Sequence, residues 1–226
     1  FSTYADIYQW KPTVLQKLPE ADIDRWILSL LQKLTCDVQF HMDAYDLSKA
    51  VSPFVEFIQQ LTNWYIRRSR SRFWSELQSQ DREEAFATLY TVLINLAKIS
   101  APFIPFLSEA IYQQLRKNED STSVHLCDFP KEDTGLRDVA LEEEMAAVQA
   151  VVSSGHALRK EHKIKVRQPL SKAHVVSSDA KTLAALRQKQ HLIAEELNVK
   201  EVHYHAEETA FVALTAKPNF RLLGKK

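Results

Sequence analysis

Cysteine, glycine and long apolar runs are all scarce in this 226-residue sequence. Two cysteines, Cys36 and Cys127, cannot build a secreted disulfide scaffold, so reduced thiols in the cytosol are the expected state. No apolar run approaches the ~18 residues that a membrane-spanning helix needs, and the opening residues lack the basic start of a signal peptide. These absences predict a cytoplasmic protein without a membrane partner.

Glycine-rich phosphate-binding loops are excluded as well. The three glycines, Gly135, Gly155 and Gly224, lie far apart, so neither G-x-G-x-x-G nor G-x-x-x-x-G-K-[ST] occurs anywhere. Charge of one sign is not in excess, because 29 basic and 29 acidic side chains give a formal net charge of zero. Any binding to nucleic acid must therefore depend on local basic patches.

The sequence does contain strong helical periodicity. Apolar residues recur at helical spacing in four stretches: one that begins at Asp22, one over about 46–74, one over about 81–100 and one that follows Pro102. Asp22 or Asp24 is expected to cap the first helix. The apolar seam of the second is predicted to be Phe54, Ile58, Leu61 and Tyr65. Four long amphipathic helices with short connections predict an antiparallel bundle.

The pattern changes after this predicted bundle. Residues 118–144 carry nine acidic and two basic side chains, with a possible short strand over 123–129. A fifth helix is predicted over about 138–161. Alternating runs at 173–177, 199–205 and 210–216, with a helix over about 181–196, then predict a small α/β subdomain. The predicted fold class is therefore mainly α.

One segment of the second helix, NWYIRRSRSRFW at 63–74, is unusually rich in arginine and aromatic residues. Continued at heptad spacing, its apolar seam reaches Arg68 and Arg72, which predicts that the core-facing stripe becomes cationic at one end. Guanidinium groups suit phosphate oxygens, and the neighbouring rings can stack on bases or brace the arginines. The alternative is that the arginines pair with acids on adjacent helices and that the tryptophans belong to the core.

A second basic patch follows the fifth helix. Six cations lie within fourteen residues, interrupted only by Glu161: Arg159, Lys160, Lys163, Lys165, Arg167 and Lys172. Cations favour a helix C-terminus in any case, but this number exceeds what capping requires. Phosphate contact is the favoured interpretation, and a solvated helix end is the alternative.

Metal and catalytic sites are not expected. His203 and His205 share one strand face, as His125 and Cys127 would, but nothing in the sequence brings the two pairs together. The carboxylates at 142–144 are interpreted as a solvated helix face. No glycine elbow surrounds a serine and no H-E-x-x-H motif occurs, so no catalytic constellation is found.

Several segments resemble one family, in the expected order along nearly the whole chain. NWYIRRSRSRFW is similar to the signature helix in the anticodon-binding region of isoleucyl-tRNA synthetases, which are class I enzymes. ADIDRWILSLLQKL, APFIPFLSEAIYQQL, SVHLCDFP, HKIKVRQPL and KPNFRLLGKK also resemble segments of that region. Valyl and leucyl enzymes share the bundle, but the arginine-rich continuation after Tyr65 resembles the isoleucyl branch best.

The resemblance implies the C-terminal, tRNA-binding part of an enzyme that joins isoleucine to its tRNA with ATP and Mg²⁺. The HIGH and KMSKS motifs, the editing domain and a zinc-binding cysteine cluster are missing, so the fragment is expected to be inactive alone and to hold no cofactor. The implied organisation is a linker from an upstream catalytic region (1–20), a helical-bundle anticodon-binding domain (21–118), an acidic connector (119–137) and a helix plus small α/β subdomain (138–226).

The implied partners are isoleucine tRNA and the catalytic and editing domains of the same parent chain, with no DNA. The residues expected to meet the tRNA are Trp64, Arg67, Arg68, Arg70, Arg72, Trp74, Arg159, Lys160, Lys163, Lys165 and Arg167. Two alternatives stay open: the anticodon-binding region of a valyl or leucyl enzyme, and a helical protein-interaction module.

Overall fold

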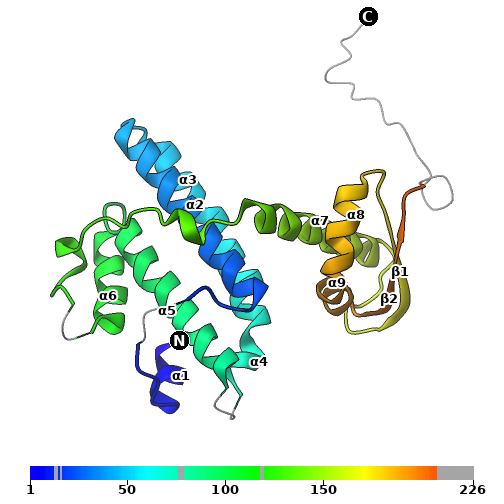
Figure 1. Ribbon diagram of the computed structural model, residues 1–226, viewed down its shortest axis with the longest axis horizontal. Coiled ribbons are helices and arrows are strands. Elements are labelled where there is room, and N and C mark those ends of the chain that lie inside the picture. Colours follow the sequence, from blue (N-terminus) through cyan, green and yellow to red (C-terminus); the bar gives the residue numbers. More distant parts are fainter. Residues whose placement is uncertain (13–14, 16, 76–78, 118–119, 208–226) are drawn as a thin grey trace, which may run out of the picture. The chain divides into compact units, whose positions relative to one another are not determined.

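The computed structural model (Figure 1) describes residues 1–12, 15, 17–75, 79–117 and 120–207. The chain forms two compact units, Phe1–Glu142 and Glu143–Lys226. Helices dominate both units, and the strands of the described residues form one two-stranded sheet. The predicted fold class, mainly α with a small α/β part, is confirmed.

The four longest helices among the described residues of the first unit are α2 (Asp22–Asp43), α3 (Leu47–Gln60), α5 (Gln80–Ser100) and α6 (Pro105–Leu115). Side chains near their first residues determine where these helices begin. The side chains of Asp46 and Ser79 cap α3 and α5, each by accepting a hydrogen bond from a backbone N–H three residues further on. Ala21 precedes α2 without a side-chain cap, so Asp22 and Asp24 lie within the first turn instead.

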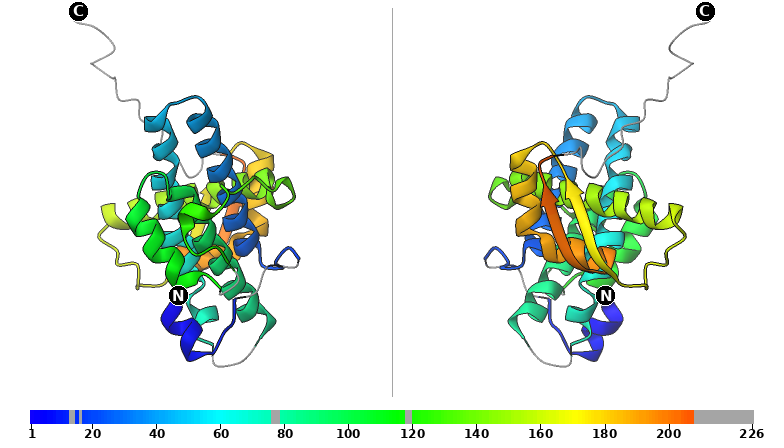
Figure 2. Two further views of the ribbon diagram at one scale, coloured as in Figure 1. Left: turned by 90° about the vertical axis from the view of Figure 1, so that its left-hand side faces the viewer. Right: turned by 90° about the vertical axis from the view of Figure 1, so that its right-hand side faces the viewer.

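The core of this unit lies between α2, α3 and α5. Trp26, Leu31 and Val38 of α2 are buried, as the helical periodicity predicted, and they share the core with Tyr65 and Phe86. Full burial of one large apolar side chain contributes about 1.5–3 kcal/mol relative to exposure. The two antiparallel helices α2 and α3 form a hairpin, which is seen from two further sides in Figure 2.

The first ten residues, part of the segment predicted to be a linker, pack on the bundle. Ser2–Ile7 forms a short helix, α1. The ring of Trp10 stacks on Phe86 of α5 with centroids 5.6 Å apart, and Phe1 meets Trp10 edge-on at 5.8 Å. These aromatic contacts are long-range in sequence, so helical periodicity could not predict them.

The strand predicted over 123–129 is wrong. The segment contains a single 3₁₀ turn, η2 (Val124–Leu126), and a second one, η3 (Thr134–Leu136), follows it. The Glu109 carboxylate accepts hydrogen bonds from the Val124 N–H (2.9 Å) and the Ser123 hydroxyl (3.0 Å), which binds this segment to α6 rather than to a sheet. Hydrogen bonds from Gln113, and then from the backbone of Val124, hold the pKa of Glu109 below its usual range.

The second unit is a parallel strand pair with helices. After α7 (Val139–Glu161) come β1 (Leu170–Val176), α8 (Ala180–Gln188), α9 (Gln190–Leu197) and β2 (Val199–His205). The register pairs Leu170 with Val199 and Val176 with His205, and parallel pairing requires a crossover such as α8 and α9 supply. The single helix predicted over 181–196 is divided at Lys189. The run at 210–216 lies outside the described residues.

Close packing in this unit depends on Gly155 of α7. A Cβ at Gly155 would lie 2.5 Å from the Cδ2 atom of Leu197, at the end of α9. Only a glycine lets the two elements approach this closely without rearrangement.

Candidate nucleic-acid interface

The long helix predicted over 46–74 is interrupted where its arginines begin. Regular α3 ends at Gln60, a π-helical stretch η1 (Leu61–Ile66) follows, and α4 (Arg70–Phe73) forms one further turn. The Thr62 hydroxyl donates to the carbonyl of Ile58 at 2.7 Å, and the Nε of Arg67 donates to the carbonyl of Asn63 at 2.7 Å. The side chains of Thr62 and Arg67 thus satisfy backbone carbonyls in the π-helical stretch and directly before it.

The π turns also shift which side chains face the core. The buried positions fall at every fourth residue, at Leu61, Tyr65, Ser69 and Phe73. Since a π-helix has more residues per turn than an α-helix, the period lengthens from 3.6. Beyond Tyr65 the predicted seam is therefore wrong in register, because the buried residues are Ser69 and Phe73, although Arg72 still directs its guanidinium toward the buried Asp24. It is also wrong at Ile58, which is 45% exposed.

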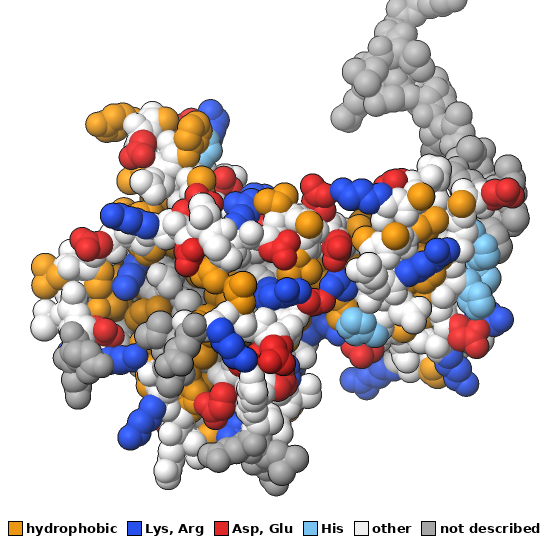
Figure 3. All heavy atoms as spheres, viewed as in Figure 1, with side chains coloured by type: hydrophobic (Ala, Val, Ile, Leu, Met, Phe, Trp, Pro, Cys, Tyr) orange, Lys and Arg blue, Asp and Glu red, His pale blue; other side chains and the backbone are white. Residues whose placement is uncertain are grey.

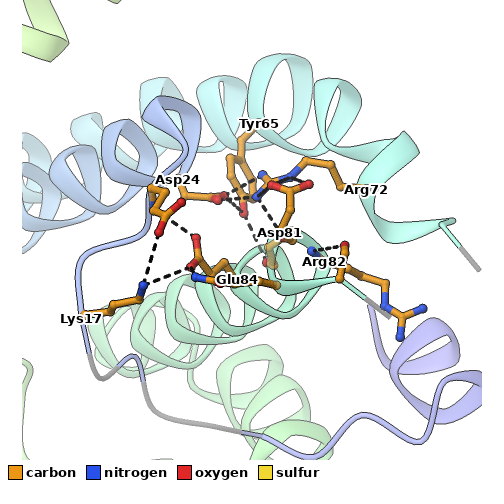
Figure 4. A network of polar contacts seen from close by, with 11 residues as sticks. Lys17, Asp24, Tyr65, Arg72, Asp81, Arg82 and Glu84 are labelled. Atoms are coloured by element: carbon orange, nitrogen blue, oxygen red, sulfur yellow. Dashed lines mark hydrogen bonds and ion pairs between the residues drawn. The ribbon is translucent and has the colours of Figure 1, made fainter. Parts of the chain in front are cut away.

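Arg72 lies against carboxylates rather than at an open surface (Figure 4). Its guanidinium donates to both carboxylate oxygens of Asp24, at 2.6 and 3.0 Å, and its Nε donates to the carboxylate of Asp81 at 2.9 Å. The Tyr65 hydroxyl donates to the same Asp24 at 2.7 Å, and Asp24 is 0% exposed. For Arg72 this geometry favours the internal-pairing alternative over the expected phosphate contact.

The electrostatics of this network follow from its burial. Burial by itself lowers the pKa of Arg72, but the hydrogen bonds to Asp24 and Asp81 outweigh it and raise the pKa above its ordinary value. Burial, followed by the charge of Asp24, raises the pKa of the Tyr65 hydroxyl well above its usual range. Arg72 is thus a permanent cation that compensates a buried carboxylate.

The other arginines of this segment lie at the surface with their aromatic neighbours. Arg67 and Arg70 are exposed and Arg68 is half-buried. The guanidinium carbon of Arg67 lies 5.9 Å from the ring centroid of Trp64, and that of Arg70 lies 6.0 Å from Trp74, which is 52% exposed. Both separations are within the range of cation–π attraction. These five residues are called the arginine–aromatic surface below.

In the second unit, the buried guanidinium of Arg159 joins two separate backbone segments. It is 5% exposed, and its guanidinium donates to the carbonyls of Lys165 (3.1 Å), Gln168 (3.0 Å), Leu197 (2.5 Å) and Asn198 (3.3 Å). These bonds fix the loop after α7 to the junction between α9 and β2. This geometry disfavours the phosphate contact expected for Arg159, because its donors point at backbone oxygens.

The loop that Arg159 organises presents the remaining cations. The Ile164 N–H bonds the Arg159 carbonyl (2.8 Å) and the Lys163 N–H bonds the Lys160 carbonyl (3.1 Å), which is the bonding pattern of a Schellman cap. Lys163 occupies the left-handed position of this cap, with φ 55°. Four exposed side chains define the basic loop: Lys160, Lys163, Lys165 and Arg167.

The family model that describes the anticodon-binding domain of tRNA ligases matches residues 24–175. The chain belongs to this family. Three similar relatives, each matched over all 226 residues of this chain, are the isoleucine–tRNA ligases of Protochlamydia amoebophila (61% identical), Chlamydia muridarum (52%) and Chlamydia trachomatis serovar L2 (51%). The chain spans 22% of the length of each. The predicted resemblance to the anticodon-binding region is confirmed.

Both surfaces lie within the part matched by the anticodon-binding family. The arginine–aromatic surface and the basic loop fall between residues 24 and 175. Lys172 lies in the matched part too, but it pairs with Glu201 on the neighbouring strand at 3.6 Å. On the face seen in Figure 3, basic and acidic side chains are interspersed, so contact with an anion depends on such local clusters.

The structural role of Asp24 is not the one predicted from the sequence. Asp22 or Asp24 was the predicted cap of the first helix, yet Asp24 is the buried carboxylate that accepts hydrogen bonds from Tyr65 and Arg72. The sequence did carry a signal, since Asp24 lies four and seven residues before Leu28 and Leu31, which are core residues of α2. A carboxylate in register with a core stripe implies a buried partner.

The histidines do not assemble a metal centre. His174 and His205 share a hydrogen bond of 3.0 Å between ring nitrogens, and His203 stacks on His174. Burial, then the neighbouring His205 and His203, lowers the pKa of His174. Within the described ranges, no group of three or more His, Cys, Asp or Glu residues could hold a metal ion. Nor does any helix in that part have the length and apolar character needed to cross a membrane.

Proposed function

We propose that this chain is the part of an isoleucine–tRNA ligase that binds the anticodon arm of isoleucine tRNA. The observation that carries the proposal is the arginine–aromatic surface, on which two exposed guanidinium groups each lie over a tryptophan ring. Arginine forks match phosphate oxygens, and aromatic faces stack on unpaired bases. The 51–61% identity to isoleucine–tRNA ligases supports isoleucine over valine or leucine.

Each element of the surface has a role in this proposal. The pairing of Arg72 with Asp24 holds α4 in place, so the turn that carries Arg70 and Trp74 is rigid before RNA arrives. Arg67, Arg68 and Arg70 contact phosphates and set the position of the arm, while Trp64 and Trp74 brace the arginines or stack on bases. The basic loop supplies further phosphate contacts from the second unit. Isoleucine activation with ATP and Mg²⁺ takes place in the catalytic part of the parent enzyme, outside this chain.

A protein-interaction module is the second candidate, favoured by one observation. Hydrophobic side chains lie exposed at the tip of the α2–α3 hairpin (Figure 3), among them Phe40, Tyr45 and Leu47. The catalytic and editing domains of the parent chain are the partners that such a surface would meet. The two candidates differ in salt dependence, because apolar contact releases no condensed counterions.

The deciding experiment measures the affinity of the chain for isoleucine tRNA and for a non-cognate tRNA over a range of salt concentrations. We expect a steep fall of log K with log salt, and the double variant Arg67→Ala/Arg70→Ala should lower that slope by about two units, one for each phosphate that is no longer bound. The control is Arg187→Ala, because Arg187 lies over the ring of Tyr204 at 5.7 Å in the same arrangement but elsewhere. Equal slopes for the double variant and the control would refute the proposal.

A further inference from the structure

The N-terminal segment, residues 1–10, packs on α5, and no step of the proposed function uses it. Its helix α1 ends in a Schellman cap, in which the N–H groups of Gln9 and Trp10 bond the carbonyls of Asp6 (3.1 Å) and Ala5 (2.8 Å). Gln9 holds the left-handed position of this cap, with φ 52°. The cap turns the chain back on itself, and Trp10 stacks on α5 directly after it.

The side chain of Arg82 in α5 (Figure 4) joins this segment to the turn that follows α4. Arg82 is 2% exposed, and its guanidinium donates to the Ser75 carbonyl at 2.8 Å. The guanidinium carbon lies 4.6 Å from the ring centroid of Tyr8, whose hydroxyl donates to the Trp74 carbonyl at 3.4 Å. A buried guanidinium thus lies between a backbone carbonyl and an aromatic face, where both attractions are stronger than at an exposed site.

The N-terminal segment and α4 also meet at one aromatic ring of α5. The ring of Phe73 contacts Phe86 edge-on with centroids 5.3 Å apart, and Tyr8 contacts the same ring at 6.4 Å. Phe73 is 7% exposed and directly precedes Trp74. The exposed Trp74 therefore stands between two anchored neighbours, since the aromatic cluster holds Phe73 and the buried guanidinium holds the carbonyl of Ser75.

Anchors on both sides of Trp74 matter for binding because a loose turn must be ordered when a ligand arrives. Ordering the backbone of one residue costs about 1–2 kcal/mol, and a turn that is fixed beforehand does not lose that free energy on binding. Arg70, whose guanidinium lies over the Trp74 ring, belongs to the same turn of chain. The packing of the N-terminal segment thus acts on part of the arginine–aromatic surface without contributing a group to it.

We infer that Tyr8 and Arg82 are positioning residues for tRNA binding, which hold the backbone around Trp74 so that Trp74 and Arg70 meet the RNA in a fixed arrangement. This inference rests on the proposed function, since its effect is measured at the arginine–aromatic surface. It gives the N-terminal segment, which the sequence predicted to be part of a linker, a role in binding.

The test uses the full 226-residue chain and isoleucine tRNA at a temperature where every variant is folded. Arg82→Gln and Tyr8→Leu should each weaken the tRNA affinity about fivefold, as expected for coupled contacts. In the Arg70→Ala/Trp74→Ala background, which lacks the positioned groups, the same changes should alter the affinity by no more than about twofold. Tyr8→Phe keeps the ring over Arg82 and should bind tRNA nearly as the unsubstituted chain does.

Arg116→Gln is the matched control, because the Arg116 guanidinium also donates to backbone carbonyls of the first unit, those of Lys117 (3.3 Å) and Asp120 (3.5 Å), at the end of α6. Thermal unfolding measures the stability of each variant. Arg116→Gln should leave tRNA affinity unchanged whatever its stability. Should Arg82→Gln not fold, Tyr8→Leu provides the same comparison, because Tyr8 is only half-buried.

The outcomes separate this inference from the proposed function. If Arg82→Gln and Tyr8→Leu lower only the melting temperature and leave tRNA affinity unchanged, the positioning role is refuted and the proposed function stands. The same conclusion follows if both changes weaken affinity equally in the unsubstituted and the Arg70→Ala/Trp74→Ala backgrounds. If the unsubstituted chain binds tRNA without salt dependence, both the proposed function and this inference are refuted.

Discussion

Arg70 and Arg72 lie two residues apart but have opposite surroundings. The sequence alone could not show which of the two is exposed and which is paired with carboxylates. Arg70 is exposed beside Trp74, whereas Arg72 is bonded to Asp24 and Asp81. Heptad extrapolation assumes about 3.5 residues per turn, and the π turns before these residues lengthen the period. The partner Asp24 lies 48 residues away in sequence, so the ion pair depends on how α2 packs in the bundle.

This contrast predicts two different phenotypes. Arg72→Ala leaves the buried carboxylate of Asp24 without its cation, which should cost about 3–5 kcal/mol of the free energy of unfolding. Arg70→Ala should change stability by no more than about 0.5 kcal/mol, because Arg70 is exposed. Urea denaturation measures both values. At a temperature where each variant is folded, only Arg70→Ala should weaken the affinity for isoleucine tRNA.

The reverse pattern would contradict this assignment. If Arg72→Ala unfolds at the same urea concentration as the unsubstituted chain but binds tRNA more weakly, Arg72 contacts the RNA. A double variant, Asp24→Asn/Arg72→Ala, is the internal control, because removal of both charges should restore part of the stability that Arg72→Ala loses.

At the scale of elements, helix positions could be predicted because local chemistry decides them. The predicted starts of α2, α5 and α7 lie within one residue of the observed ones, since caps, acidic first turns and apolar periodicity all act within a few residues. The strand over 123–129 failed because a strand requires a partner, and Glu109 bonds this segment instead. The Schellman cap at Lys163 was also missed, because no glycine marks its left-handed position.

The unusual cap allows a charge to be removed without damage to the fold. Lys163→Gly places in the left-handed position the residue that tolerates it best, so stability should be unchanged or higher by up to about 1 kcal/mol. If the basic loop meets phosphates, the same variant should weaken tRNA binding and lower the salt slope by about one unit. Thermal unfolding and salt-dependent binding measure the two effects.

Lys163→Arg is the control for this variant, because it keeps both the cation and the strained backbone. It should bind tRNA with the unsubstituted salt slope. If Lys163→Gly and Lys163→Arg bind tRNA with equal affinity, the Lys163 side chain does not contact the tRNA, whatever the stabilities of the two variants.

At the scale of the whole molecule, the function could be inferred from the segments that resemble synthetases. It could not be inferred from the net charge. The chain has zero formal net charge, yet the part matched by the anticodon-binding family contains both cationic surfaces. The structure separates these cations, since Arg72 and Arg159 are bonded inside the protein and the other arginines and lysines of the two surfaces are exposed or half-buried. Burial of a long cationic side chain depends on tertiary packing, so composition could not separate the two groups.

The last prediction concerns the chain as a competitor of a complete ligase. The sequence contains neither HIGH nor KMSKS, so the purified chain should show no isoleucine-dependent pyrophosphate exchange and no tRNA charging. Added in excess to a full-length isoleucine–tRNA ligase, it should raise the apparent KM for tRNA and leave pyrophosphate exchange unchanged, because it sequesters tRNA without touching isoleucine activation. The Arg67→Ala/Arg70→Ala chain should compete less. Charging by the purified chain that a substitution within it abolishes, or inhibition of pyrophosphate exchange, would contradict the assignment of this chain to tRNA binding alone.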